Sequence, residues 1–248
     1  MTNTHHPTQN NRGVMHPLSD ISQRFVLFAA KAEHPVMDMG CAYGNTVIEA
    51  LHQGAKRVIA CDMEPQHLAA LRDSITDPDT LARLETQSGK FPQEFVFDPG
   101  SISAIHISHV LEFLSGVDIE VGLRRCFEWL HSGGRLFLIT YSIYIKELAH
   151  AKFTAEYQKR LAQDLAWPGY FEQYNEYVCL PDNDADAVNE LQLPDALHMF
   201  DIPHLTRAME QAGFTIESAD YLDGKRNGAV PETWHDGREY VGIIASKP

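Results

Sequence analysis

The sequence lacks several features that would mark particular classes of protein. No apolar run approaches the ~20 residues that a bilayer-spanning helix needs. The first residues, Met1–His6, lack the charged and apolar regions of a secretory signal. The four cysteines show no Cys-x-x-Cys spacing, and Cys41 and Cys61 fall in or beside expected strands. We therefore expect a reduced, cytoplasmic protein with no membrane segment.

Positive charge is also scarce. The chain has 20 Lys and Arg against 34 Asp and Glu, a formal net charge of −14. The basic residues are scattered instead of forming a stripe, which disfavours a nucleic acid as partner. The acidic run Asp182–Asp186 lacks the glycine and terminal glutamate of an EF-hand loop, so we expect a solvated loop there and no metal site.

What is present fits one α/β domain. Residues 1–14 are polar and predict a mobile tail, and residues 15–248 are long enough for a single domain with an elaborate insertion. As far as residue 141, short apolar strands alternate with amphipathic helices, a pattern typical of a parallel sheet with helices on both faces. The expected strands begin with Val36 and Met37 and continue as Arg57–Asp62, Arg83–Gln87, Ser101–Ser108 and Arg135–Thr140.

Residues 142–202 break this alternation. Residues 142–200 hold no obvious strand; a helix is expected over Ile143–Leu165, followed by an aromatic cluster of Tyr170, Phe171, Tyr174 and Tyr177. We expect a helical insertion that forms a lid over the acceptor of a reaction, with packing of the insertion's own small core as the alternative.

The last part of the chain returns to regular structure. A helix is expected over His204–Ala212, then strands over Phe214–Leu222 and Glu239–Ser246. Because no crossover helix separates these two strands, they predict an antiparallel hairpin on an otherwise parallel sheet. The polar loop between them, Asp223–Gly237, is a candidate surface for a homodimer.

The stretch Val36–Asn45 predicts a strand, a tight glycine turn and the start of a helix. Gly40 and Gly44 suit a backbone that turns sharply and lets a ligand come close, and Asn45 can cap the helix that follows. Asp62 ends the next strand, 22 residues after Gly40. At that position an acid can accept bonds from both hydroxyls of a ribose, although an exposed strand-end aspartate is the alternative.

Taken in order, four features resemble the class I S-adenosylmethionine (SAM)-dependent methyltransferases over residues 35–141 and 203–246. The features are Asp38-x-Gly40-x-x-x-Gly44, Asp62, Gly133-Gly134 and Ala212-Gly213-Phe214. The resemblance implies a doubly wound, mostly parallel seven-stranded sheet with the last strand reversed. It also implies an enzyme with SAM bound along the strand tips.

The resemblance also implies a set of SAM-binding positions. Those expected to frame its methionine and ribose parts are Asp38, Gly40, Cys41, Ala42 and Gly44, with Asp62 on the ribose hydroxyls, Met63 on the adenine, Ser88 and Gly89 at the adenine amine, and Ser108 and His109 beside the methionine part. The chain departs from the family pattern twice. Ala42 replaces the usual middle glycine, and Ser88-Gly89-Lys90 stands where an acid often meets the adenine.

The sulfonium of SAM already carries an activated methyl, so the protein mainly has to align the acceptor. A base is needed only if the acceptor arrives protonated. His109 is the main candidate base, with Tyr141 and Tyr144 leaving the fifth strand toward the same rim; backbone contact and packing are the alternatives. Glu112 either orients an acceptor or begins a turn.

These features predict transfer of a methyl group from SAM to an oxygen or nitrogen of a small molecule. Two alternatives stay open: methylation of a protein or RNA, and a non-catalytic protein of this fold that binds a partner. The acceptor itself cannot be read from the chain. His198 and His204, which flank the return to the core, are expected to be surface or capping residues.

Overall fold

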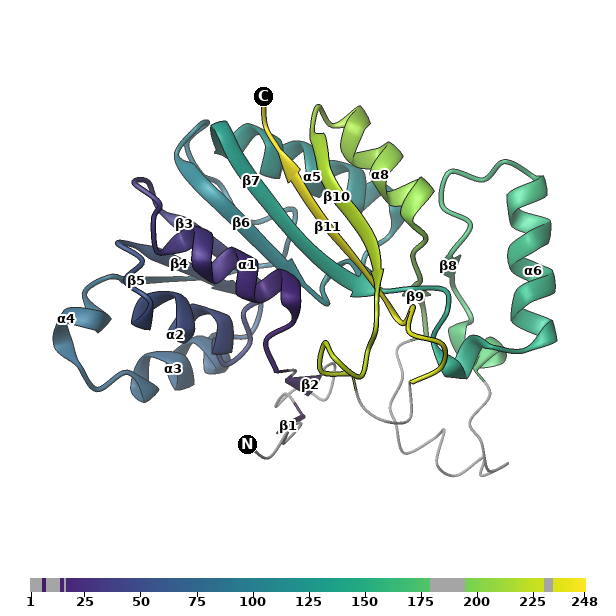
Figure 1. Cartoon of the computed structure of the whole chain (residues 1–248), viewed down its shortest axis with the longest axis horizontal. Helices are drawn as coiled ribbons and strands as arrows, with labels where there is room; N and C mark the ends of the chain where they lie inside the picture. Colours follow the sequence, from purple (N-terminus) through teal and green to yellow (C-terminus); the bar gives the residue numbers. More distant parts are fainter. Residues whose placement is uncertain (1–5, 8–13, 16, 179–194, 230–233) are drawn as a thin grey trace.

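The computed structural model describes residues 6–7, 14–15, 17–178, 195–229 and 234–248. Its centre is a seven-stranded sheet in the order β10-β11-β7-β6-β3-β4-β5 (Figure 1). The strands are β3 (Val36–Met39), β4 (Val58–Asp62), β5 (Leu84–Ser88), β6 (Ile102–Ser108), β7 (Leu130–Tyr141), β10 (Thr215–Leu222) and β11 (Tyr240–Ser246).

Strand β11 runs against the rest of the sheet. It pairs antiparallel with both β7 and β10, whereas the pairs β3–β4, β3–β6, β4–β5 and β6–β7 are parallel. The expected doubly wound sheet with a C-terminal antiparallel hairpin is therefore confirmed. The carboxyl ends of β3, β4 and β6 lie along one edge, which is where ligands bind in sheets of this kind.

Helices cover both faces of the sheet. On one face α1 (Asp20–Ala29), α2 (Asn45–His52) and α3 (Pro65–Ser74) pack over a core that includes Phe25 and Leu71. On the other face α5 (Gly116–Trp129) and α8 (Ile202–Gln211) cover a second core. Alternate residues of β3 and β6 enter the two cores, so both strands are buried on both sides, as a central parallel strand requires.

Side-chain caps explain where several helices begin. Ser19, Ser115 and Asp201 accept the backbone N–H three residues on, at the starts of α1, α5 and α8. The expected cap of α2 by Asn45 is wrong. Asn45 is the first helical residue, and Gly44 in the left-handed conformation makes the turn into the helix without a side-chain bond.

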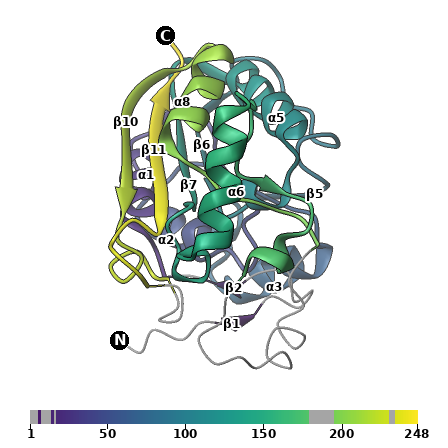
Figure 2. The ribbon, with the colours of Figure 1, turned by 90° about the vertical axis from the view of Figure 1, so that its right-hand side faces the viewer.

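The insertion differs from its expected form. Its helix α6 spans only Ala151–Ala162, preceded by a short 3-10 turn, Lys146–Leu148. Two short strands, β8 (Tyr170–Phe171) and β9 (Leu197–His198), pair antiparallel, so the expectation of no strand between 142 and 200 is wrong. A separate core includes Phe153, Tyr157 and Tyr174, and Figure 2 shows α6 in front of the sheet when the molecule is viewed from this end.

Three further features complete the fold. A short helix, α4 (Pro78–Leu81), is capped by the Asp77 side chain. Helix α5 ends at Trp129 and β7 begins at once, so Gly133 and Gly134 lie within that strand. In the expected tail, β1 (His6–Pro7) pairs with β2 (Val14–Met15). The acidic run Asp182–Asp186 lies outside the described residues.

Candidate functional site

The turn after β3 has the left-handed backbone that the glycine spacing predicts. Gly40, Ala42 and Gly44 have φ of 77°, 45° and 78°. A Cβ on Gly40 would lie 2.3 Å from Cγ2 of Val110, so the loop approaches the segment that follows β6 too closely for any side chain. Ala42 adopts the left-handed conformation despite its Cβ, which costs about 1–3 kcal/mol and marks the loop as strained.

The Asp62 side chain accepts several hydrogen bonds beside this loop. Its side chain is buried, and its two oxygens accept the N–H groups of Ala42 at 2.8 Å and Glu64 at 2.9 Å. Nδ1 of His67, on α3, lies 3.1 Å from Oδ1. A carboxylate has about four acceptor positions, so these contacts leave one for a ligand, on Oδ2. The alternative of an exposed strand-end aspartate is wrong.

The residues after β4 and β5 meet next to Asp62. The N–H of Gly89 donates to the carbonyl of Asp62 at 3.0 Å, and the Ser88 hydroxyl lies 3.5 Å from the carbonyl of Met63. The Met63 side chain is exposed (40%) and free to cover a flat ligand. The structure thus brings Ser88, Gly89 and Met63 to the same edge as the glycine loop.

Asp38, in contrast, faces into the core under α1. Its Oδ1 lies 2.7 Å from Nδ1 of His106, and Nε2 of that ring lies 3.1 Å from the Ser22 hydroxyl. All three residues are buried, and Phe25 stacks on the His106 ring at 5.1 Å. The Asp38 carboxylate therefore ties α1 to β3 and β6 and supports the glycine loop from below.

A second polar cluster lies where β6, β7 and β11 meet. His109 follows Ser108 at the end of β6 with a φ of 53°, and its N–H donates to the carbonyl of Ile139 at 3.0 Å. Its Nδ1 lies 2.7 Å from Oε1 of Glu112. The rings of Tyr141 and Tyr240 each lie 4.8 Å from the His109 ring.

The two tyrosines of this cluster stay protonated at neutral pH. Burial, followed by the charge of Glu112, raises the pKa of Tyr141 far above its ordinary value. Burial and then the neighbouring Tyr141 do the same to the pKa of Tyr240. Both phenols can donate hydrogen bonds, and the imidazole of His109 has one nitrogen that donates and one that accepts in its neutral form.

Comparison with known proteins gives a consistent result for this architecture. A family model described as a methyltransferase domain matches residues 36–134, the segment that runs from β3 into β7 and contains the glycine loop, Asp62 and His109. Residues 36–134 carry a methyltransferase domain.

Solved structures agree with the methyltransferase fold over nearly the whole chain. A SAM-dependent methyltransferase from Mesorhizobium loti aligns with a TM-score of 0.63 at 17% identity, over 90% of this chain and 95% of that one. A SAM-dependent methyltransferase from Methanosarcina mazei gives 0.62 at 16%, over 90% and 96%. Geranyl diphosphate C-methyltransferase from Streptomyces coelicolor, solved with Mg²⁺, geranyl diphosphate and S-adenosylhomocysteine, gives 0.59 at 13%, over 91% and 79%. The search of curated proteins finds no significant match.

The carboxyl edge of the sheet has polar groups and an exposed side chain at the positions expected for SAM. The open acceptor position on Asp62 suits a ribose hydroxyl, and the exposed Met63 suits an apolar base. Gly40 and Gly44 of the loop have no side chain at left-handed backbone positions, which suits the close approach of a ligand. Within the described ranges, no group of three or more His, Cys, Asp or Glu is placed to hold a metal.

Of the three candidate catalytic residues, the methyltransferase domain brings two together. His109 and Tyr141 are in contact, but Tyr144 points away, with Arg238 lying 3.8 Å from its ring centre and Tyr221 at 5.1 Å. There Tyr144 lines a cavity of about 460 Å³ between α6 and the start of α8. A cavity of this volume is large enough for a small molecule.

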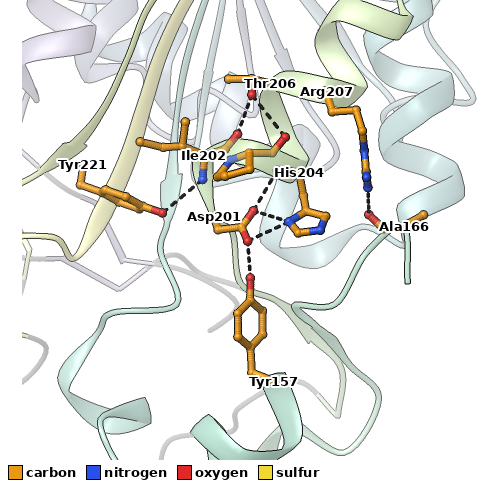
Figure 3. A network of polar contacts seen from close by, with 9 residues as sticks. Tyr157, Ala166, Asp201, Ile202, His204, Thr206, Arg207 and Tyr221 are labelled. Carbon is orange, nitrogen blue, oxygen red and sulfur yellow. Dashed lines mark hydrogen bonds and ion pairs between the residues drawn. The ribbon is translucent and has the colours of Figure 1, made fainter. Parts of the chain in front are cut away.

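A polar network forms one wall of this cavity (Figure 3). Asp201 accepts a hydrogen bond from the Tyr157 hydroxyl, and Nδ1 of His204 lies 2.7 Å from both carboxylate oxygens of Asp201. The network ties α6 of the insertion to the start of α8. His204 thus belongs to the helix cap, as expected, whereas His198 is buried against Phe200 and is not a surface residue.

The sequence did not predict the roles of four residues that organise these clusters. Three of them, His67, His106 and Tyr240, were not singled out, and Glu112 was not expected to contact His109. One signal was available for His106. It lies between Ile105 and Ile107 in an apolar strand, where a polar side chain must find a buried partner. His67, Tyr240 and Glu112 gave no comparable signal, because their partners are distant in sequence or depend on a local turn.

Proposed function

We propose that this protein transfers the methyl group of SAM to an oxygen or nitrogen atom of a small molecule. The observation that carries the proposal is the burial of the polar cluster at the ends of β6, β7 and β11. Glu112 and Tyr240 are 1% and 0% exposed, the His109 side chain is 13% exposed, and Tyr141 packs against the core of the insertion. A reacting atom must enter this enclosed position, which suits a small acceptor.

The cofactor's place is proposed from the fit of the strand ends. Gly40, Cys41, Ala42 and Gly44 would present backbone to the methionine and ribose parts, and Asp62 would accept one ribose hydroxyl through Oδ2. Met63, Ser88 and Gly89 would surround the adenine, and the backbone of Ser108 and His109 would lie beside the methionine part. Asp38 takes a different role from the expected one, because its carboxylate is bound to His106.

The chemistry asks little of the protein beyond alignment. Bound SAM supplies a methyl group on a positively charged sulfur, which is already activated for transfer. The chain's own residues would exclude water under the insertion, orient the acceptor against Tyr141 and Tyr240, and receive a proton at His109.

Charge supports a small acceptor over RNA. The chain has a formal net charge of −14, and an acidic protein has little electrostatic attraction for a polyanion. The structural relative from S. coelicolor is a methyltransferase solved with geranyl diphosphate, a small molecule.

We also propose a cytoplasmic location, supported by the free, buried thiols of Cys41, Cys61 and Cys126. The loop Asp223–Gly237 stays our candidate surface for a homodimer.

Incubation with methyl-labelled SAM and fractionated cell extract tests the proposal. Extract is separated into metabolites below about 1 kDa, proteins and RNA, and each fraction is incubated with wild-type protein and with His109→Ala. We expect label in the metabolite fraction, reduced by His109→Ala by the ~10² to 10⁴ that a general base contributes. Label confined to the protein or RNA fraction would refute a small acceptor.

A further inference from the structure

Glu112 is a deeply buried acidic residue in the cluster at β6, β7 and β11. It lies in the 3-10 turn Leu111–Phe113, directly after β6, and is 1% exposed. Its Oε1 lies 2.7 Å from Nδ1 of His109, and its Oε2 is buried with no hydrogen-bond partner within the described ranges. A buried carboxylate with one partner is costly unless that partner compensates its charge.

The contact decides which nitrogen of His109 is basic. A carboxylate accepts a hydrogen bond, so the Nδ1 that faces Oε1 carries the proton. In the neutral ring the other nitrogen, Nε2, is then the proton acceptor. The same turn that places Glu112 three residues after His109 therefore sets the tautomer of the ring.

Other ionisable side chains surround the His109 ring. Tyr141 of β7 and Tyr240 of β11 pack against the ring, and both stay neutral. Glu147, in the 3-10 turn of the insertion, and Tyr174, in the turn Tyr174–Tyr177, lie within electrostatic range of Tyr141. Among the groups named here, Glu112 is the carboxylate in direct contact with the ring.

We propose that Glu112 is the positioning residue of a His109–Glu112 pair, and that the acceptor is a hydroxyl or a neutral nitrogen with an N–H, either of which loses a proton during methyl transfer. This inference rests on the proposed function and narrows its substrate class. An acceptor with no proton to lose, such as a tertiary amine or a thioether, has no use for such a pair.

The step balances without another reactant. A lone pair of the acceptor oxygen or nitrogen forms the new bond to the methyl carbon, while the electron pair of the breaking carbon–sulfur bond stays on sulfur. The acceptor's proton moves to Nε2 of His109. The resulting imidazolium keeps its Nδ1–H on Glu112, and the proton later leaves to solvent.

Nitrogen-15 NMR of histidine-labelled protein tests the pair without any acceptor. For wild type at a pH where His109 is neutral, we expect the Nδ1–H tautomer. Glu112→Met removes the acceptor at similar volume, and His109 should change to the Nε2–H tautomer. Glu112→Gln can still accept from Nδ1–H and should retain the wild-type tautomer, while Glu210→Met, on the exposed face of α8, is the control. An Nδ1–H tautomer that persists in Glu112→Met would overturn the proposal.

The second arm measures turnover with labelled SAM on a panel of phenols, alcohols and primary amines against tertiary amines and thioethers. We expect product only from the first group, with kcat lowered about a hundredfold by Glu112→Met, less by Glu112→Gln, and unchanged by Glu210→Met. Affinity for S-adenosylhomocysteine, measured by calorimetry, should stay within twofold in all three variants.

Each outcome of these two arms has a defined meaning. Product from tertiary amines or thioethers alone, or full kcat in Glu112→Met, contradicts the proposed pair. Product from neither group would instead refute the proposed function, while the NMR arm still decides whether Glu112 sets the tautomer.

Discussion

The carboxyl edge of the sheet has two halves that were built under different constraints. At β3, β4 and β5 the site consists of backbone: a left-handed loop, the Asp62 carboxylate and the N–H groups around it. At β6, β7 and β11 it consists of side chains that meet from distant parts of the chain, under an insertion with its own core. The first half could be predicted from short motifs, whereas the second becomes visible only in three dimensions.

The largest expected effect comes from a substitution in the glycine loop, in the half of the edge formed by β3, β4 and β5. In Gly40→Ala the new Cβ would lie 2.3 Å from Cγ2 of Val110 at a φ of 77°, so the loop must move. Strain of about 1–3 kcal/mol should weaken SAM binding by roughly 5- to 150-fold by calorimetry.

Two further variants separate the causes of this effect. Gly133→Ala has a similar φ of 82° with nothing within 4 Å, so it carries the backbone cost away from the site. Adding Val110→Ala to Gly40→Ala should recover part of the affinity. If Gly40→Ala binds SAM with wild-type affinity, the glycine loop does not form part of the cofactor site.

The next effect is on the stability of the insertion, which should depend on pH through His198 in β9. Burial lowers the pKa of His198 from 6.5 to about 4. The folded state therefore favours the neutral ring, while the unfolded state takes up a proton near pH 6.5. The stabilisation is fully present above that pH and is lost as the pH falls toward 4, at a cost of roughly 3 kcal/mol.

Thermal unfolding between pH 7 and 4 checks this expectation. The wild-type Tm should fall more steeply than that of His198→Gln, which has no group to titrate at this position. Parallel curves for the two proteins would show that His198 contributes nothing to the acid sensitivity of the insertion.

A smaller effect should follow from loosening the contact between the insertion and α8. Tyr157→Phe removes the hydroxyl that donates to Asp201. We expect a loss of about 1–2 kcal/mol, seen as a fall in Tm of a few degrees with SAM affinity unchanged. Tyr221→Phe, whose hydroxyl accepts from the N–H of Ile202 at a long 3.3 Å, should lose less. An equal loss in both would argue against a special role for the Tyr157 contact.

The difference between the halves also explains what could be predicted from the sequence. Gly40 and Gly44 are constrained by backbone conformation, and Asp62 by its place after a strand, so local sequence carries the signal. The partners of Asp38 and Asp62 could not be found this way. His106 meets Asp38 from the neighbouring strand β6, and His67 meets Asp62 from helix α3. The roles of the insertion's tyrosines differ for the same reason: Tyr174 fills its core, Tyr144 lines a cavity, and Tyr157 does both.

One titration compares the two halves directly. S-adenosylhomocysteine is titrated by calorimetry into wild-type protein, Asp62→Ala and Glu112→Met, with the Tm of each recorded to confirm that it is folded. If the cofactor lies at β3 and β4 and the acceptor at β6 and β7, Asp62→Ala should lose at least tenfold in affinity while Glu112→Met stays within twofold of wild type. Unchanged affinity in folded Asp62→Ala, or an equal loss in Glu112→Met, would contradict that division.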